Sequence, residues 1–227
     1  MIRTIFSWNT DGMIMLGMNK EEYGIVRGKY RKPYVFIDCY LDNIQVDGVM
    51  INLDDRRGGY LMGQYLIEQG HRKILFLADN FEGGDYERYY GFAAAMNEAS
   101  CAVGKENFFQ LHTDEQALLE SLEQVAAIAH RYTAIFCASD YYALRTMNFL
   151  RDKGIRVPED ISIAGFDDNQ YSRLARPEIT TIHQSAAEKG VQAVRSIMGQ
   201  LKGNPIKNNW IVLPVSLVER GSVRKII

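Results

Sequence analysis

The sequence predicts an open α/β protein in which helices cover a parallel β-sheet. Short apolar runs alternate along the chain with longer segments that repeat apolar residues at helical spacing. Most of the apolar runs are continuous rather than alternating in hydrophobicity, which is typical of strands covered on both faces. A regular alternation of strand, helix and strand indicates parallel βαβ units with right-handed connections.

Each expected element follows from one of these patterns. In chain order, the apolar runs predict strands at 12–17, 34–39, 46–52, 73–78, 107–112, 134–138, 161–166, 179–183 and 210–218. The clearest helical segments lie between them, at 59–69, 88–100, 114–131, 141–153 and 186–201. Gly70 and Gly154 follow their helices at the position of a left-handed cap, and Pro158 lies just beyond the second.

Composition and charge restrict the possible partners of this polypeptide. The chain has 227 residues and a formal net charge of −2, with 47% hydrophobic and 24% charged residues. These proportions are ordinary for a globular protein. Nucleic-acid-binding surfaces usually carry a stripe of lysine and arginine, and no such stripe is visible here. We therefore expect this polypeptide itself not to contact DNA.

Neither export nor metal binding is expected. No signal peptide is recognisable at the start, and no stretch approaches the roughly 20 apolar residues needed to span a bilayer. These observations predict a cytoplasmic protein. Cys39, Cys101 and Cys137 are odd in number and widely spaced, so they form neither a disulfide framework nor a CxxC pair. Cys137 lies in an apolar run and is expected to be a small buried residue.

Polar side chains follow the ends of several predicted strands. In an open parallel sheet these positions line the ligand-binding edge. Carboxylates recur there with one arginine, a set that suits a neutral sugar or polyol whose hydroxyls both donate and accept hydrogen bonds. The residues are Asp38, Asp79, Asn80, Arg88, Ser139, Asp140, Asp167 and Asp168.

Each of these residues also has a structural alternative. Asp140, and the pair Asp54 and Asp55, precede expected helices and could act as N-terminal caps. Asp167 has no long helix directly after it, so its position leaves both readings open. Arg88 opens an expected helix, where a cation opposes the helix dipole. That misfit favours a functional reason for the arginine.

Signatures of an enzyme are missing from the sequence. It contains no GxSxG elbow, no GxxxxGK[ST] phosphate loop and no GxGxxG at the start of a helix. The four histidines show no HxxxH or HxH spacing that would indicate a zinc site. We therefore expect no enzymatic activity, no cofactor and no metal.

Six segments, taken together, resemble the effector-binding region of the LacI/GalR family of transcription regulators. They occur in the family's order, and the tail LPVSLVER at 213–220 resembles the family's closing strand. The segments are DGMIM at 11–15, KPYVFID at 32–38, GHRKI at 70–74, RYYGF at 88–92, GIRVPEDISIAGFDD at 154–168 and PEITTIHQ at 177–184.

The resemblance implies a fold like that of the periplasmic binding proteins, with two Rossmann-like subdomains that flank a cleft. Residues 1–51 and 184–212 would form the N-terminal, DNA-proximal subdomain, and residues 52–183 and 213–227 the C-terminal one. Family members begin with a helix-turn-helix head and a βαβα unit, which are not found before Asp11. We therefore expect an incomplete, gapped first sheet and weak or no effector binding by this chain.

The resemblance also implies an effector site. Arg88 and Asp167 match the family's effector-binding arginine and aspartate and would clamp a sugar or similar molecule. The position that is usually Asn-Asp reads Ser139-Asp140, which loses one donor and one acceptor. Asp38, Gln184 and Ile51 match further cleft positions.

A homodimer and operator DNA are the partners that the resemblance implies. The dimer would involve Leu144, Met147 and Leu174, and DNA would be bound only through the head. Effector binding would change how the two heads are spaced. Two alternatives remain open at this point: an exported sugar-binding protein of the same fold, and an α/β enzyme.

Overall fold

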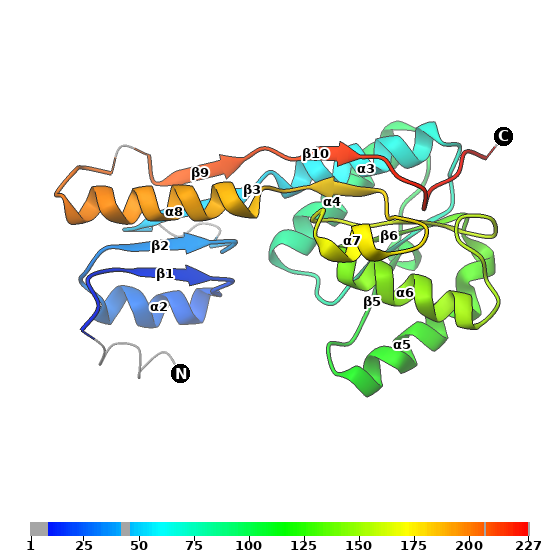
Figure 1. Cartoon of the computed structure of the whole chain (residues 1–227), viewed down its shortest axis with the longest axis horizontal. Helices are drawn as coiled ribbons and strands as arrows, with labels where there is room; N and C mark the ends of the chain where they lie inside the picture. Colours follow the sequence, from blue (N-terminus) through cyan, green and yellow to red (C-terminus); the bar gives the residue numbers. More distant parts are fainter. Residues whose placement is uncertain (1–8, 42–45, 207, 227) are drawn as a thin grey trace. The chain divides into compact units, whose positions relative to one another are not determined.

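The chain folds into two compact units, each with its own parallel sheet. The computed structural model describes residues 9–41, 46–206 and 208–226. Unit 1 comprises Met1–Asp54 and Ser185–Pro214, and unit 2 comprises Asp55–Gln184 and Val215–Ile227. Helices and parallel strands alternate in both units (Figure 1), which confirms the predicted α/β class.

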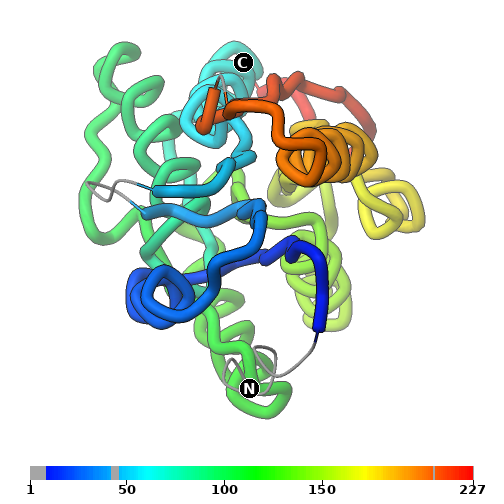
Figure 2. Tube along the Cα trace, turned by 90° about the vertical axis from the view of Figure 1, so that its left-hand side faces the viewer, coloured from blue at the N-terminus to red at the C-terminus, as the bar shows by residue number. Residues whose placement is uncertain are grey.

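Unit 1 is a four-stranded parallel sheet between two helices. Its strands are β1 (Met13–Leu16), β2 (Tyr34–Ile37), β3 (Val49–Leu53) and β9 (Trp210–Leu213), hydrogen-bonded in the order β1-β2-β3-β9. Helices α2 (Lys20–Lys29) and α8 (Ala186–Leu201) lie on opposite faces of this sheet (Figures 1 and 2). Tyr23 and Val26 of α2 pack against Phe36 and Met50 of the strands.

The sheet of unit 1 is continuous, so the expectation of a gap is wrong. Met13 of β1 pairs directly with Tyr34 of β2, and β2 continues into β3 and β9. The expectation placed the missing strands in the middle of the sheet. Because β1 is an edge strand of the described sheet, a further strand would extend the sheet at that edge.

Unit 2 contains a second four-stranded parallel sheet and most of the helices. Its strands are β4 (Ile74–Ala78), β5 (Phe108–Gln110), β6 (Ala134–Cys137) and β7 (Ser162–Ala164), in the order β5-β4-β6-β7. The antiparallel pair β8 (Thr181–His183) and β10 (Ser216–Val218) also belongs to this unit. The helices of unit 2 are α3 (Asp55–Glu68), α4 (Gly83–Glu98), η1 (Lys105–Asn107), α5 (Glu115–Ile128), η2 (Ala129–Arg131), α6 (Asp140–Asp152) and α7 (Gln170–Leu174).

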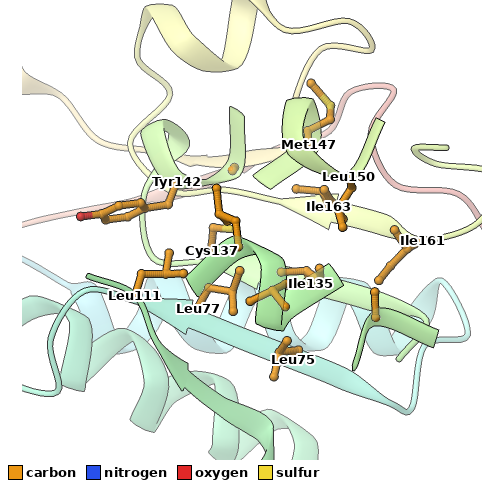
Figure 3. Packing of buried hydrophobic residues seen from close by; sticks show 14 of the residues in the cluster. Leu75, Leu77, Leu111, Ile135, Cys137, Tyr142, Met147, Leu150, Ile161 and Ile163 are labelled. Carbon is orange, nitrogen blue, oxygen red and sulfur yellow. The ribbon is translucent and has the colours of Figure 1, made fainter. Parts of the chain in front are cut away.

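One apolar core lies between the sheet of unit 2 and the helices α5 and α6. Figure 3 shows Leu75, Leu77, Ile135 and Cys137 of the strands packed beside side chains of α6. Cys137 is fully buried, and burial raises the pKa of its thiol. This confirms that Cys137 is a small core residue rather than a reactive thiol.

Two differences from the sequence prediction have local reasons. Helix α2 was not predicted because Gly24 and Gly28 weaken its pattern, although Asn19 and Glu22 form a capping box at its start. The apolar run at 210–218 splits into β9 and β10 at Pro214, which has no backbone N–H to donate to a sheet.

Within the described part of the chain, none of the helices could cross a membrane.

Candidate functional site

Arg88 is held at the centre of a polar cluster in unit 2. It lies inside α4, which begins at Gly83, so the prediction that it opens a helix is wrong. Its Nε donates to Oδ1 of Asp55 at 2.7 Å, and Nη1 donates to the carbonyl oxygen of Ala138 at 2.7 Å. Its Cζ lies 3.9 Å from the centre of the Phe166 ring. The guanidinium is therefore fixed by three different elements.

The electrostatics of Arg88 are dominated by carboxylates. Burial alone would lower the pKa of the guanidinium, but Asp55, Asp167 and Asp85 outweigh it and raise the pKa. Asp55 is itself only 2% exposed. A buried charge pair of this kind is stable only when both partners stay in place, because removal of one leaves the other uncompensated.

Two glycines bring α3 and α4 close enough to place Arg88 beside Asp55. A Cβ at Gly59 of α3 would lie 1.9 Å from the carbonyl oxygen of Arg88. A Cβ at Gly91 of α4 would lie 1.9 Å from the carbonyl oxygen of Arg56. Both neighbours are backbone atoms, so any side chain at these positions would push the two helices apart.

Asp79 and Asp85 form an acidic pair next to Arg88. Asp79 follows β4, and its Oδ2 accepts a hydrogen bond from the hydroxyl of Tyr142 at 2.9 Å. Asp85 lies in the first turn of α4, 3.5 Å from Nη1 of Arg88. Burial and the neighbouring Asp79 raise the pKa of Asp85 to about 7, although Arg88 opposes the shift. Asp85 therefore holds a proton more easily than an exposed carboxylate does.

Asp167 occupies a strained backbone position at the end of β7. Its φ is 115°, and that of Asp168 is 54°, both in a region that favours glycine. The N–H of Asp167 donates to the carbonyl oxygen of Ile182 at 2.8 Å, which ties the turn to β8. Such strain persists only where the surroundings enforce it, and it is concentrated at functional sites.

Gln184 extends the site from Asp167. Its Nε2 donates to Oδ1 of Asp167, while its Oε1 is buried with no hydrogen-bond partner among the described residues. A buried acceptor without a donor costs free energy. The amide oxygen is thus available to an O–H or N–H group that enters beside Asp167.

Ser139 and Asp140 are structural in this arrangement. Ser139 caps α6, and its Oγ accepts from the N–H of Tyr142. The capping role considered for Asp140 is therefore taken by its neighbour. Asp140 is fully buried: Oδ1 accepts from the hydroxyl of Thr181 at 2.6 Å and Oδ2 from the N–H of Asn169 at 2.9 Å. Burial raises its pKa to about 7.

Asp168 anchors the same turn through cations. Its carboxylate pairs with Arg220, Arg173 and the ring of His183. Burial alone would raise the pKa of Asp168, but these three partners lower it to about 2. Both carboxylate oxygens of Asp168 are occupied by these basic partners, so we do not expect Asp168 to bind a ligand.

In unit 1, Asp38 follows β2 as the sequence predicted, with a φ of 53°. Nζ of Lys189 donates to its Oδ1 at 2.8 Å and to its Oδ2 at 2.6 Å. Lys189 is buried, whereas the Asp38 side chain is 39% exposed. Ile51 lies within β3 and is fully buried, so it offers no surface to a ligand in this structure.

The three residues predicted for a dimer interface differ in accessibility. Leu174, at the end of α7, is 68% exposed. Leu144 of α6 is half-buried. Met147 belongs to the core cluster of unit 2 drawn in Figure 3. It is 2% exposed, so it leaves almost no surface for a partner.

Several residues of the site were not identified from the sequence. Asp55 was interpreted only as a possible cap, and Asp85 and Phe166 were not considered. No sequence signal marks Asp55 as the partner of Arg88, because the two meet only through the crossing of α3 and α4. Among the described residues, no group of three potential ligands is placed to hold a metal ion.

Comparison with known proteins shows a match to one domain family and to related transcriptional repressors. The family model for the periplasmic binding protein-like domain matches residues 64–223. The repressor PurR of Mannheimia succiniciproducens is 35% identical over 195 residues, which cover 86% of this chain and 58% of that protein. PurR of Vibrio vulnificus is 31% identical over 99% of this chain and 68% of its own.

Solved structures agree on the fold. The transcriptional regulator CelR in complex with cellobiose superposes with a TM-score of 0.88 at 24% identity, covering 97% of this chain and 68% of that one. The chain belongs to the periplasmic-binding-protein-like effector domains of the LacI/GalR family of transcription regulators. It spans 58% of the length of the Mannheimia relative.

Substitution of Gly59 tests the role of the helix crossing. We expect Gly59→Ala to destabilise unit 2 by about 2 kcal/mol or more, because its methyl group would collide with the backbone of Arg88. Gly190→Ala is the control, since Gly190 lies in α8 with open space around it and alanine favours helices. Urea unfolding curves measure both, and equal stabilities would contradict the proposed crossing.

The raised pKa of Asp140 predicts a pH-dependent stability. The folded state holds this proton up to about pH 7, whereas an unfolded aspartate has the ordinary pKa of 3.8. Stability from this group is therefore full at low pH and lost as the pH rises from about 4 to 7. We expect Asp140→Asn to flatten that slope in thermal unfolding. The exposed Asp152→Asn should leave it unchanged, and an unchanged slope in Asp140→Asn would contradict the assignment.

Proposed function

We propose that this chain is the effector-sensing core of a LacI/GalR-type transcription regulator and that its effector is a neutral sugar or a similar polyol. The observation that carries the proposal is the fixed guanidinium of Arg88 inside a shell of carboxylates. Regulation and DNA binding belong to the whole protein and are part of the proposal. So is the assignment of unit 1 as the DNA-proximal subdomain, and action in the cytoplasm.

The charge of the site favours a neutral effector. Asp55, Asp85 and Asp167 surround one arginine, so a phosphate or carboxylate would face more negative than positive charge. Nε of Arg88 donates to Asp55 and Nη1 donates to Ala138, so an anion finds no free pair of Nε and Nη2 donors on this guanidinium. A sugar hydroxyl, by contrast, can bind at this site through single hydrogen bonds, because it carries no charge that needs a paired cation.

The hydrogen-bonding groups favour an effector rich in donors. Asp167 and the unpaired Oε1 of Gln184 both accept hydrogen bonds, and they are adjacent. Sugar hydroxyls donate to carboxylates and amide oxygens and can accept from a guanidinium. The same fold accommodates cellobiose in the regulator CelR.

An effector acts on such a regulator only through a difference in affinity between two conformations. Arg88, Asp167 and Gln184 are proposed as its direct contacts in unit 2. Asp38 is proposed as a contact from unit 1, since its carboxylate remains partly exposed beside Lys189. Ser139, Asp140 and Ile51 would act by supporting the fold around these contacts.

Isothermal titration of neutral mono- and disaccharides, and of their phosphate esters, tests the proposal. We expect saturable binding of a neutral sugar and weaker binding of its phosphate. Arg88→Lys should reduce the affinity by about 10- to 100-fold, because lysine cannot replace the fork of donors. Arg151→Lys, on the exposed side of α6, is the matched control and should bind normally.

Two results would overturn this assignment. One is binding of a sugar phosphate that is tighter than that of the neutral sugar and that is lost in Arg88→Lys. The other is an Arg88→Lys variant that folds normally, by circular dichroism, and binds with unchanged affinity.

The reason for expecting weak binding, a gapped first sheet, does not hold, since the described sheet of unit 1 is continuous.

We further propose that the chain forms a homodimer through a surface that includes Leu174 and Leu144. Leu174 is the most exposed leucine of unit 2 among the described residues, and a large apolar side chain is costly to leave in water. Leu144 lies half-buried on α6, the helix that contacts α7.

Leu174→Lys should shift the protein toward monomers by placing a charge in the interface. Sedimentation velocity at several concentrations would show a dissociation constant raised by about tenfold or more. Leu119→Lys on α5, which also replaces a partly exposed leucine, is the matched control. A monomeric native protein, or equal dimerisation by both variants, would contradict the interface.

A further inference from the structure

A cavity separate from the polar cluster around Arg88 lies within unit 1. Its volume is about 390 Å³. It is lined by residues from the end of α2, the start of β2 and the segment after α8. Asp38 follows the opposite end of β2, so this cavity is separated from the proposed effector contact by the length of that strand. Nothing in the proposed function uses it.

The charge of this cavity is positive, although the chain as a whole has a net charge of −2. Arg27, Arg31 and Lys32 line it, and Asp47 is the acidic residue among the lining residues. Arg27 and Asp47 form a half-exposed pair with 3.4 Å between Nε and Oδ2. An exposed pair at this distance is weak, so Asp47 neutralises the cluster only in part.

Arg31 and Lys32 retain unused donors. Arg31 is exposed and makes no hydrogen bond or ion pair with any described residue, so its N–H donors are unused by the protein. Nζ of Lys32 donates to Oδ1 of Asn9 at 3.1 Å and to the carbonyl oxygen of Thr10. An ammonium group has three donors, so one remains. Arg31 and Lys32 lie beyond the end of α2, whose last turn contains the basic residues Arg27 and Lys29.

The remaining walls are suited to an organic molecule rather than to a bare ion. Tyr30 and Tyr34 lie on one side with ring centres 6.2 Å apart. Gln200 and Asn204 contribute amide groups. Ile206 adds an exposed apolar surface. Aromatic and amide walls around a few cations are typical of pockets that hold a small polar ligand.

We propose that this cavity binds a phosphate group, held by Arg31 through paired N–H donors and by Lys32 and Arg27 as further positive charges. Arginine matches the geometry of phosphate oxygens, and lysine adds a compact charge. The aromatic and amide walls favour a small phosphorylated molecule as the carrier of this phosphate, and the backbone of duplex DNA is the alternative source that the experiment separates. The proposal is independent of sugar binding in unit 2.

Chemical-shift mapping on the ¹⁵N-labelled protein tests the proposal, with inorganic phosphate and ribose 5-phosphate as probes. We expect saturable shifts for residues 27–34 and 200–206, and none with an equal ionic strength of sodium chloride. Arg31→Gln should weaken binding about tenfold, in line with loss of a charge-assisted hydrogen bond. Arg195→Gln, an exposed arginine of α8 outside the cavity, is the matched control.

A parallel titration with a short duplex of arbitrary sequence separates the two sources of phosphate. Shifts at these residues with the free phosphates indicate a small molecule, and shifts with the duplex alone indicate the DNA backbone. Absence of saturable shifts with every probe, or equal binding by Arg31→Gln and the native protein, overturns the proposal. The variant Arg88→Lys should bind the phosphates normally, so failure of sugar binding would remain distinguishable.

Discussion

The buried charge of Arg88 is the constraint on which the architecture of unit 2 depends. A guanidinium removed from water without partners would cost several kcal/mol. Asp55 on α3, the carbonyl of Ala138 after β6 and the ring of Phe166 after β7 each meet part of that requirement. The guanidinium of Arg88 therefore connects α3 with the segments that follow β6 and β7, although these are far apart in the sequence. The close approach of α3 and α4 at Gly59 and Gly91 is the geometric condition for this pairing.

Two aspartates in the same region show how surroundings decide the protonation of identical groups. Asp140 is buried against neutral donors, and its pKa is raised to about 7. Asp168 has three basic partners, and its pKa is lowered to about 2. Both side chains fix the turn that carries Asp167. Asp140 accepts hydrogen bonds from Thr181 and Asn169, whereas Asp168 pairs with three basic groups. The strained backbone of Asp167 is thus held from two sides.

Much of the fold could be predicted from the sequence because parallel βα units have a strong hydrophobic signature. The apolar runs located the strands of both sheets, and the ends of those strands located Asp38, Asp79 and Asp167. The pairing of Arg88 with Asp55 could not be predicted, since it depends on how closely two helices approach in space. The sheet order of unit 1 also escaped prediction, because hydrophobicity identifies strands but not their neighbours.

Local competition between neighbouring residues explains the remaining errors. Asp140 was a reasonable candidate for a helix cap, but Ser139 one position earlier takes that role and leaves the carboxylate free to bind Thr181 and Asn169. Met147 lies on the face of α6 that packs into the core and is buried. Leu174, at the end of α7, is exposed. The helix that contains Met147 was predicted from the sequence, and the direction of its side chain was decided by packing.

The division of both units along the chain has a consequence for synthesis on the ribosome. Unit 2 is built mainly from one uninterrupted segment, Asp55–Gln184, and needs only the final residues to add β10 beside β8. Unit 1 needs β9, which emerges late, to complete the edge of its sheet beside β3. Strand β3 therefore waits for its neighbour β9, and β2 and β3 wait for the covering helix α8, until the intervening segment of unit 2 has been translated. Nascent chains of this protein expose a half-finished sheet while the middle of the chain is already folding.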